Sequence, residues 1–175
     1  MDFAPDIRHQ MDLLLEAELL ILRFPLWWFG LPGILKGWVD RVFAAGAIYG
    51  GDVGWYSDGI LRGRRAMIAM TTGGPADSFA HDGLSGNLDM VLWPIQNGML
   101  NFVGYDVLPP FVAYSPARVD QAAREAMLAD YEARLRAIET TAPLPFHPLE
   151  DFEERRLRTG VEPLTVGQGR LDKSG

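Results

Sequence analysis

Apolar positions along the chain follow two spacings, and these separate helical segments from strands. Residues 5–17 place apolar side chains three and four positions apart, which is the spacing of one helix face. The next residues, 19–24, form a nearly continuous apolar run that stops at Pro25. Such a run is typical of a strand buried on both faces of a parallel sheet. The pattern therefore predicts a helix followed by a buried strand.

Helical and strand patterns continue to alternate as far as residue 139. The predicted elements are a helix that begins at Pro32 and is capped by Gly46, a strand over 66–71, a helix over about 84–102 that bends near Pro94, an edge strand over 107–114 that contains two prolines, and an amphipathic helix over 118–139. This alternation indicates an α/β domain with a parallel sheet. We predict one domain over residues 1–145 and an extended tail over residues 146–175.

Two loops are predicted at the carboxyl ends of strands, where open parallel sheets bind their ligands. The first loop, residues 25–32, contains the adjacent aromatic residues Trp27, Trp28 and Phe29. Either Trp28 and Phe29 fill the core beneath the next helix, or the loop forms an apolar wall for a planar ligand. The second loop, Thr-Thr-Gly-Gly at 71–74, is either a plain turn or a backbone that a ligand approaches closely.

Composition narrows the possible functions. The net charge of -7 argues against a nucleic-acid binder, because neutralising phosphates requires clustered basic residues. One short basic cluster, Arg62, Arg64 and Arg65, is interpreted as a solvated turn rather than a phosphate site. The chain has no cysteine, so thiolate chemistry is excluded and a cytoplasmic location is expected. We also expect no membrane span and no metal site, because the three histidines are far apart in the sequence.

Two long blocks of sequence resemble a known family. Residues 24–43 read FPLWWFGLPGILKGWVDRVF, and residues 71–74 and 92–108 read TTGG and LWPIQNGMLNFVGYDVL. These blocks resemble the NAD(P)H:quinone reductases of flavodoxin-like fold, a family that also includes ancillary subunits of bacterial potassium-efflux systems. The resemblance extends from about residue 5 to residue 145. It implies a flavodoxin-like, three-layer α/β sandwich with a parallel sheet.

The resemblance also implies a set of binding residues, although it assigns no catalytic residue. Phe79 and Ser85 occupy positions where animal members use a tyrosine and a histidine to stabilise the reduced flavin. Phe79 can stack but cannot donate a hydrogen bond. The residues implied to contact the flavin are Pro25, Leu26, Trp27, Trp28, Phe29, Thr71, Thr72, Gly73, Gly74 and Phe79, and those implied to line the substrate pocket are Tyr49 and Phe102.

The implied reaction is two-electron hydride transfer from NAD(P)H to a quinone. The transfer is ping-pong through a bound flavin, FAD or alternatively FMN, in a homodimer whose sites are shared between subunits. The first alternative is a regulatory ancillary subunit of a potassium-efflux system. The second is a catalytically impaired, truncated homologue that folds only within a dimer.

The start of the chain departs from the family pattern. Family members begin with a strand, a phosphate-binding loop, a helix and a second strand, and a βαβ unit needs about 30 residues. Only a few residues precede the helix predicted over 5–17. We therefore expect an N-terminally truncated fold whose 19–24 strand has an unpaired, apolar edge. A start codon further upstream is the preferred explanation, ahead of a natural fragment or a degenerate gene.

Overall fold

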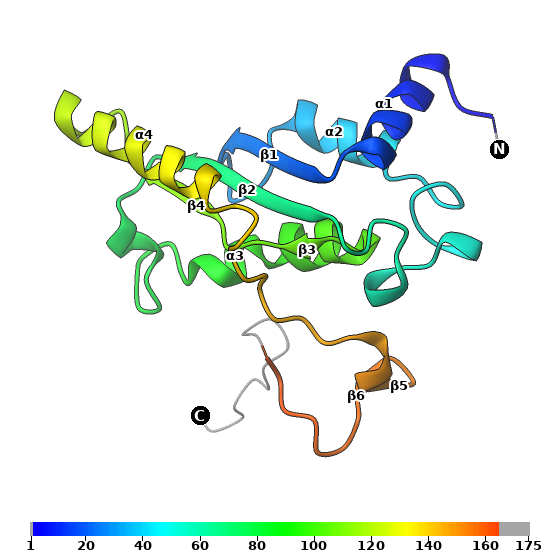
Figure 1. Ribbon diagram of the computed structural model, residues 1–175. Helices are drawn as coiled ribbons and strands as arrows, with labels where there is room; N and C mark the ends of the chain where they lie inside the picture. Colours follow the sequence, from blue (N-terminus) through cyan, green and yellow to red (C-terminus); the bar gives the residue numbers. More distant parts are fainter. Residues whose placement is uncertain (1, 165–175) are drawn as a thin grey trace.

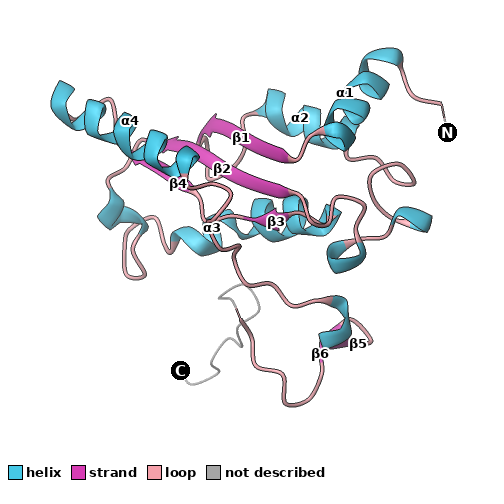
Figure 2. Ribbon diagram, in the orientation of Figure 1, coloured by secondary structure: helices cyan, strands magenta, loops and turns pink. Residues whose placement is uncertain are grey.

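A computed structural model describes residues 2–164 of the chain. Helices and strands alternate along most of the sequence, and Figures 1 and 2 show their arrangement. The helices are α1 (Pro5–Glu16), α2 (Gly33–Val42), α3 (Leu88–Ile95) and α4 (Gln121–Arg136), and the strands are β1 (Leu19–Pro25), β2 (Arg65–Thr72), β3 (Asp106–Val107), β4 (Phe111–Tyr114), β5 (Phe152–Glu153) and β6 (Arg156–Leu157).

Strand β2 is the centre of the parallel sheet. It pairs with β1 along the full length of β1, and with both β3 and β4 on its other side. The predicted strand over 107–114 is therefore two short strands, because Pro109 and Pro110 lack the amide that a continuous ladder needs. Its predicted place at a sheet edge is confirmed. Among the described residues, β1 pairs only with β2, so its other edge is open.

Helices cover both faces of the sheet, which makes a three-layer sandwich (Figure 2). On β2, alternate residues face opposite sides. Ala66, Ile68 and Met70 belong to the core that α1, α2 and α3 cover. Met67 and Ala69 belong to a smaller cluster that includes Tyr131 of α4. The predicted flavodoxin-like fold class is confirmed by this architecture.

Two predicted helix boundaries are wrong. Helix α2 ends at Val42, and Gly46 instead lies in the following turn with φ 76°, where its amide donates to the Tyr49 carbonyl. The helix predicted over 84–102 begins only at Leu88 and changes type after Pro94. Proline removes a helical hydrogen bond, and the chain continues as the π-helix η4 (Gln96–Leu100) and the 3₁₀-helix η5 (Asn101–Val103).

The basic cluster at the beginning of β2 is structural, so its interpretation as a solvated turn is wrong for two of its arginines. The Arg65 guanidinium donates to the Ile138 carbonyl at 2.6 Å and to the Thr141 carbonyl at 2.8 Å. The Arg64 guanidinium donates to the Leu14 carbonyl at 3.4 Å. These bonds tie the ends of α4 and α1 to the beginning of β2.

The segment after α4 extends below the sheet in the view of Figure 1 and folds into a small hairpin. Phe146 packs against the main core, and strands β5 and β6 pair antiparallel. Residues 165–175 of the predicted tail lie outside the described residues. Within residues 2–164, no helix is long and apolar enough to cross a membrane.

Candidate functional site

The first loop leaves β1 in a tight two-residue turn. The Leu26 amide donates to the Thr71 carbonyl at 2.8 Å, which fixes the start of the loop against β2. Trp27 and Gly30 then exchange two backbone hydrogen bonds, of 3.2 and 3.0 Å. The intervening residues, Trp28 and Phe29, have φ values of 51° and 59°. Left-handed backbone costs about 1–2 kcal/mol for each residue other than glycine.

This turn presents aromatic rings to solvent. The exposed fraction is 60% for Trp27, 97% for Trp28 and 54% for Phe29, whereas Leu26 packs against the core. The interpretation in which Trp28 and Phe29 fill the core is therefore wrong. The arrangement is that of an exposed apolar wall, held by a strained backbone, and such strain is concentrated at functional sites.

The second loop is held in place from both of its flanks. The Thr72 hydroxyl donates to the Gly74 carbonyl at 2.8 Å. From the end of β4, the Ser115 amide donates to the Thr72 carbonyl at 2.9 Å, and the Ser115 hydroxyl donates to the Gly73 carbonyl at 3.1 Å. Thr72 and Ser115 are buried, while Thr71 and Gly73 are exposed. The loop backbone is thus fixed with one side open.

Both loops carry amides that are free to donate. Within residues 2–164, the amides of Trp28, Phe29, Gly73 and Gly74 have no hydrogen-bond acceptor. A methyl group added at Gly73 would meet no atom within 4 Å, so this backbone faces open space. Two adjacent loops therefore offer backbone donors beside exposed rings, which suits a planar ligand with polar edge atoms.

Phe79 lies close to both loops, beside Phe29 of the first and Gly74 of the second. Its ring centroid lies 6.5 Å from that of Phe29 and 6.1 Å from that of Tyr114, which ends β4. Phe79 is buried, so its stacking contacts are made within the chain. A Cβ at Gly74 would lie 3.4 Å from the Phe79 ring. Burial, followed by the negative charge of Asp89, raises the pKa of Tyr114.

Tyr114 and Ser115 were not predicted from the sequence as site residues. Tyr114 ends β4 and Ser115 follows it, at the sheet edge where the two predicted loops begin, because β4 ends beside Thr72 in the parallel register. Their position in the sequence was the available signal. The third predicted strand ends at the same edge of the sheet as the other two, so its last residue and the residue after it belong among the candidate site residues.

Tyr49 and Phe102 belong to a separate aromatic cluster. Their ring centroids are 5.2 Å apart, and Phe102 also lies 5.1 Å from the Tyr56 ring and 6.3 Å from the Trp55 ring. The structure therefore brings the two predicted substrate-pocket residues together. Trp55 and Tyr56 were missed, although they lie in the same glycine-rich segment as Tyr49.

This second cluster is not beside the two loops. The Leu61 amide donates to the carbonyl of Val103, next to Phe102, so the cluster lies near the amino end of β2. Thr71 and Thr72 lie at the opposite end of this eight-residue strand. At roughly 3.3 Å per residue, the strand separates the two groups by about 23 Å. The residues implied to contact the flavin and those implied to line the substrate pocket therefore form two separate groups within this chain.

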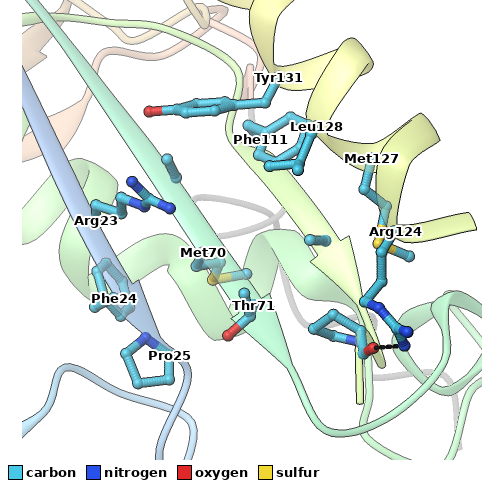
Figure 3. Close-up of a pocket in the computed structure, with 13 residues that line it drawn as sticks. Arg23, Phe24, Pro25, Met70, Thr71, Phe111, Arg124, Met127, Leu128 and Tyr131 are labelled. Atoms are coloured by element: carbon cyan, nitrogen blue, oxygen red, sulfur yellow. Dashed lines mark hydrogen bonds between the residues drawn. The ribbon is translucent and has the colours of Figure 1, made fainter. Parts of the chain in front are cut away.

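A cavity of about 480 Å³ lies on the α4 face of the sheet, and Figure 3 shows its lining. Pro25 and Thr71, where the two loops begin, form part of its wall. The remaining wall is mainly apolar, but the Arg23 guanidinium lies 5.8 Å from the centre of the Tyr131 ring. This cavity therefore adjoins the first candidate site from the side of α4.

Other chemistry has little support in the described part of the chain. No group of three or more histidine, aspartate or glutamate side chains could hold a metal among residues 2–164. His147 is buried, with Nδ1 2.7 Å from an Asp151 carboxylate oxygen and Nε2 3.1 Å from the Glu162 carbonyl. These contacts make it a structural residue of the segment after α4.

Together, the fold and the first site define an α/β protein with a candidate site for a planar ligand at the carboxyl ends of parallel strands. The family model described as flavodoxin-like fold matches residues 1–135. The chain therefore belongs to the flavodoxin-like fold family.

Similarity to individual proteins narrows this assignment. The chain is 39% identical over 143 residues to human ribosyldihydronicotinamide dehydrogenase [quinone], covering 81% of this chain and 61% of that protein. A candidate quinone reductase from Klebsiella pneumoniae superposes with a TM-score of 0.78 at 35% identity, covering 93% and 63% of the two chains. General stress protein 14 from Treponema denticola, solved in complex with FMN, superposes with a TM-score of 0.64 at 27% identity over 77% and 72%. The chain thus spans about three fifths of the human relative.

Proposed function

We propose that this chain belongs to a flavin-dependent NAD(P)H:quinone oxidoreductase. The observation that carries the proposal is the pair of loops at the carboxyl ends of β1 and β2. Exposed rings at 27–29 lie beside the amides of residues 28, 29, 73 and 74, which have no acceptor among residues 2–164. A flavin ring has this combination of a flat apolar face and a polar edge. The names of the human and Klebsiella relatives, a quinone dehydrogenase and a candidate quinone reductase, support the same activity.

The chain's residues would hold and orient the ring. In this proposal the side chains of Trp27, Trp28 and Phe29 cover one face, and the amides of Gly73 and Gly74 donate to the polar edge. Donors aimed at an edge that gains negative charge stabilise the reduced state. When bound, the flavin supplies the hydride chemistry between NAD(P)H and the quinone, in two separate half-reactions.

Stabilisation of the reduced ring would fall mainly on backbone groups. Phe79 has no hydroxyl to donate and is buried beneath the loops. Ser85 matches the position where animal members of the family have a histidine. Its amide donates to the Ser78 carbonyl at 2.8 Å. We propose FAD as the cofactor, with FMN as the alternative, and the FMN complex of the Treponema protein supports flavin binding at this fold.

We further propose that the active unit is a homodimer. Tyr49 and Phe102 lie about one strand length from the flavin loops of their own chain, as estimated above from β2. A quinone cannot contact both groups within one chain. A two-fold arrangement would place the aromatic cluster of one subunit over the loops of the other. The absence of cysteine fits a reducing compartment, and we propose a cytoplasmic location.

The relatives favour an enzyme over a regulatory subunit. The human and Klebsiella proteins described above are named for quinone chemistry, whereas the efflux-subunit interpretation has no separate observation in its favour. We therefore retain the enzymatic function alone.

The test begins with the absorbance spectrum of the purified 175-residue chain after incubation with FAD or FMN and gel filtration. Retained flavin absorption is expected, with a solution mass of two chains. NADH and NADPH should bleach the bound flavin, and a quinone should restore its colour. A folded chain that retains neither flavin would contradict the cofactor assignment. Bound flavin that no nicotinamide donor reduces would contradict the enzymatic function.

A further inference from the structure

A second cavity, of about 450 Å³, lies between the Tyr49–Phe102 cluster and the segment after α4. We call it the aromatic cavity. One wall consists of Trp55, Tyr56 and Phe102. The Phe152 ring, in β5, also lines the cavity. The volume is within the range of roughly 300–1,000 Å³ typical of small-molecule sites. The cavity is therefore large enough for a fused aromatic ring system.

The segment after α4, which forms part of the cavity wall, is held in place by contacts within the chain. The Leu149 amide donates to the Ser57 hydroxyl at 3.0 Å, which ties this segment to the loop that carries Tyr56. The His147 ring lies edge-on to Phe152, with centroids 6.0 Å apart. Both His147 nitrogens are engaged by Asp151 and by the Glu162 carbonyl, so His147 has no free nitrogen for a ligand. The cavity is thus a built space rather than a loose surface groove.

Few polar side chains line the cavity. Asn97 and Asn101 both line the cavity, and the Asn101 amide donates to the Asn97 side-chain oxygen at 2.9 Å. This bond leaves the Asn97 amide group free to donate. Asn97 belongs to the π-helix, a rare conformation that occurs frequently at functional sites. Burial raises the pKa of Tyr56, which keeps its hydroxyl protonated and able to donate.

Arg155 supplies the positive charge. It lines the cavity from the tip of the β5–β6 hairpin, in the two-residue turn that joins Glu153 to Arg156. Across the described residues, no carboxylate oxygen lies within 4.0 Å of its guanidinium, and the guanidinium makes no hydrogen bond. Glu154 and Arg155 have φ values of 48° and 67°. The hairpin therefore holds an unpaired guanidinium, in a strained turn, beside apolar rings.

We propose that the aromatic cavity binds a fused aromatic compound that carries an anionic group, and that Arg155 selects for the anion. The rings would stack against the walls formed by Trp55, Tyr56 and Phe102, and the anion would accept hydrogen bonds from the guanidinium fork. This inference rests on the proposed function for one point only: that the bound compound is the electron acceptor. Acceptors with a sulfonate or carboxylate on the ring should then be preferred over neutral quinones.

Binding is tested first, without flavin or nicotinamide donor, so that the result does not depend on the proposed function. Isothermal titration of the full chain compares anthraquinone-2-sulfonate with the neutral 2-(hydroxymethyl)anthraquinone. Because Arg155 is exposed, we expect a preference for the sulfonate of about two- to fivefold in Kd. Arg155→Gln should abolish the preference, and Arg155→Lys should restore part of it. The matched control is Arg156→Gln, which removes the same charge from the same hairpin without altering the cavity wall.

Several outcomes would overturn the proposal. Equal affinity for the two compounds would show that the cavity does not select for an anionic group. An equal loss of the preference for the sulfonate in Arg155→Gln and Arg156→Gln would show that the overall charge of the hairpin, and not Arg155, causes the preference. In the flavin-loaded protein, the same preference should then be present in kcat/KM, and its absence there would contradict the assignment to the electron acceptor.

Discussion

Gly73→Ala tests whether a ligand lies against the second loop. The added methyl group would meet no atom within 4 Å, and Gly73 does not have a positive φ. The protein itself therefore has no steric reason to require glycine at this position. In the proposed complex, however, the Gly73 amide faces the polar edge of the flavin, and a methyl group would occupy part of the space between them.

The expected magnitudes differ sharply for stability and binding. The free energy of unfolding should be unchanged or should rise by about 0.4–1 kcal/mol, because alanine restricts the unfolded chain. Flavin binding should lose about one hydrogen bond, which is worth on the order of 1.5 kcal/mol. That loss corresponds to a Kd about tenfold weaker. A stable protein with a specific binding defect is the expected phenotype.

The assay pairs thermal unfolding with flavin titration followed by fluorescence. Gly33→Ala is the matched control, because Gly33 also has no atom within 4 Å of its ideal Cβ and no positive φ. Gly33 begins α2 and lies beyond the first loop. If Gly73→Ala folds and binds flavin as tightly as the unaltered chain, the ring does not lie against this backbone, and the proposed orientation is refuted.

Two further predictions concern backbone strain and buried polarity. Replacing Trp28 and Phe29 by Asn and Gly, the preferred pair for a turn with two positive φ values, should raise the free energy of unfolding by about 1–2 kcal/mol. The same variant should weaken flavin binding. A loss of thermal stability in this variant would contradict the strain assigned to the turn. Burial raises the pKa of Tyr105 to about 12, while a nearby arginine lowers it in part. Because the folded pKa is above the unfolded value near 10, this stabilisation is complete below pH 10 and is lost as the pH rises towards 12. Tyr105→Phe should remove the part of the alkaline loss of stability that comes from Tyr105. Chemical denaturation between pH 9 and 12 measures this, and an unaltered pH profile of the free energy of unfolding would contradict the role assigned to Tyr105.

The sequence pattern predicted the sheet better than the helix ends. The apolar runs at 19–24 and 66–71 could be assigned because strands buried on both faces need continuous apolar residues. The π-helix after Pro94 could not be predicted, because wide turns have no simple periodicity. The two short strands at 106–107 and 111–114 were merged for a related reason: the prolines mark the break, but only the sheet geometry shows that pairing resumes after it.

The candidate site was only partly predictable. Strand order placed the loops at 25–32 and 71–74 on one edge of the sheet, and the structure shows them joined by the Leu26–Thr71 hydrogen bond. Composition could not decide whether Trp28 was buried or exposed, because that depends on the positive φ values of a single turn. The resemblance associated Tyr49 with Phe102, but their distance from the loops along β2 is a property of the folded chain alone.

A common feature links the two proposed halves of the site. Each is flanked by a two-residue turn in which both residues have positive φ without being glycine: Trp28–Phe29 in the first loop and Glu154–Arg155 in the hairpin. Asparagine and glycine would relieve the strain in either turn, but neither could supply an aromatic wall or a guanidinium. In both places the chain retains a costly backbone conformation that positions a large side chain at a candidate ligand surface. If the two surfaces meet across a dimer, as we propose, ring stacking and anion selection would act on the same bound acceptor.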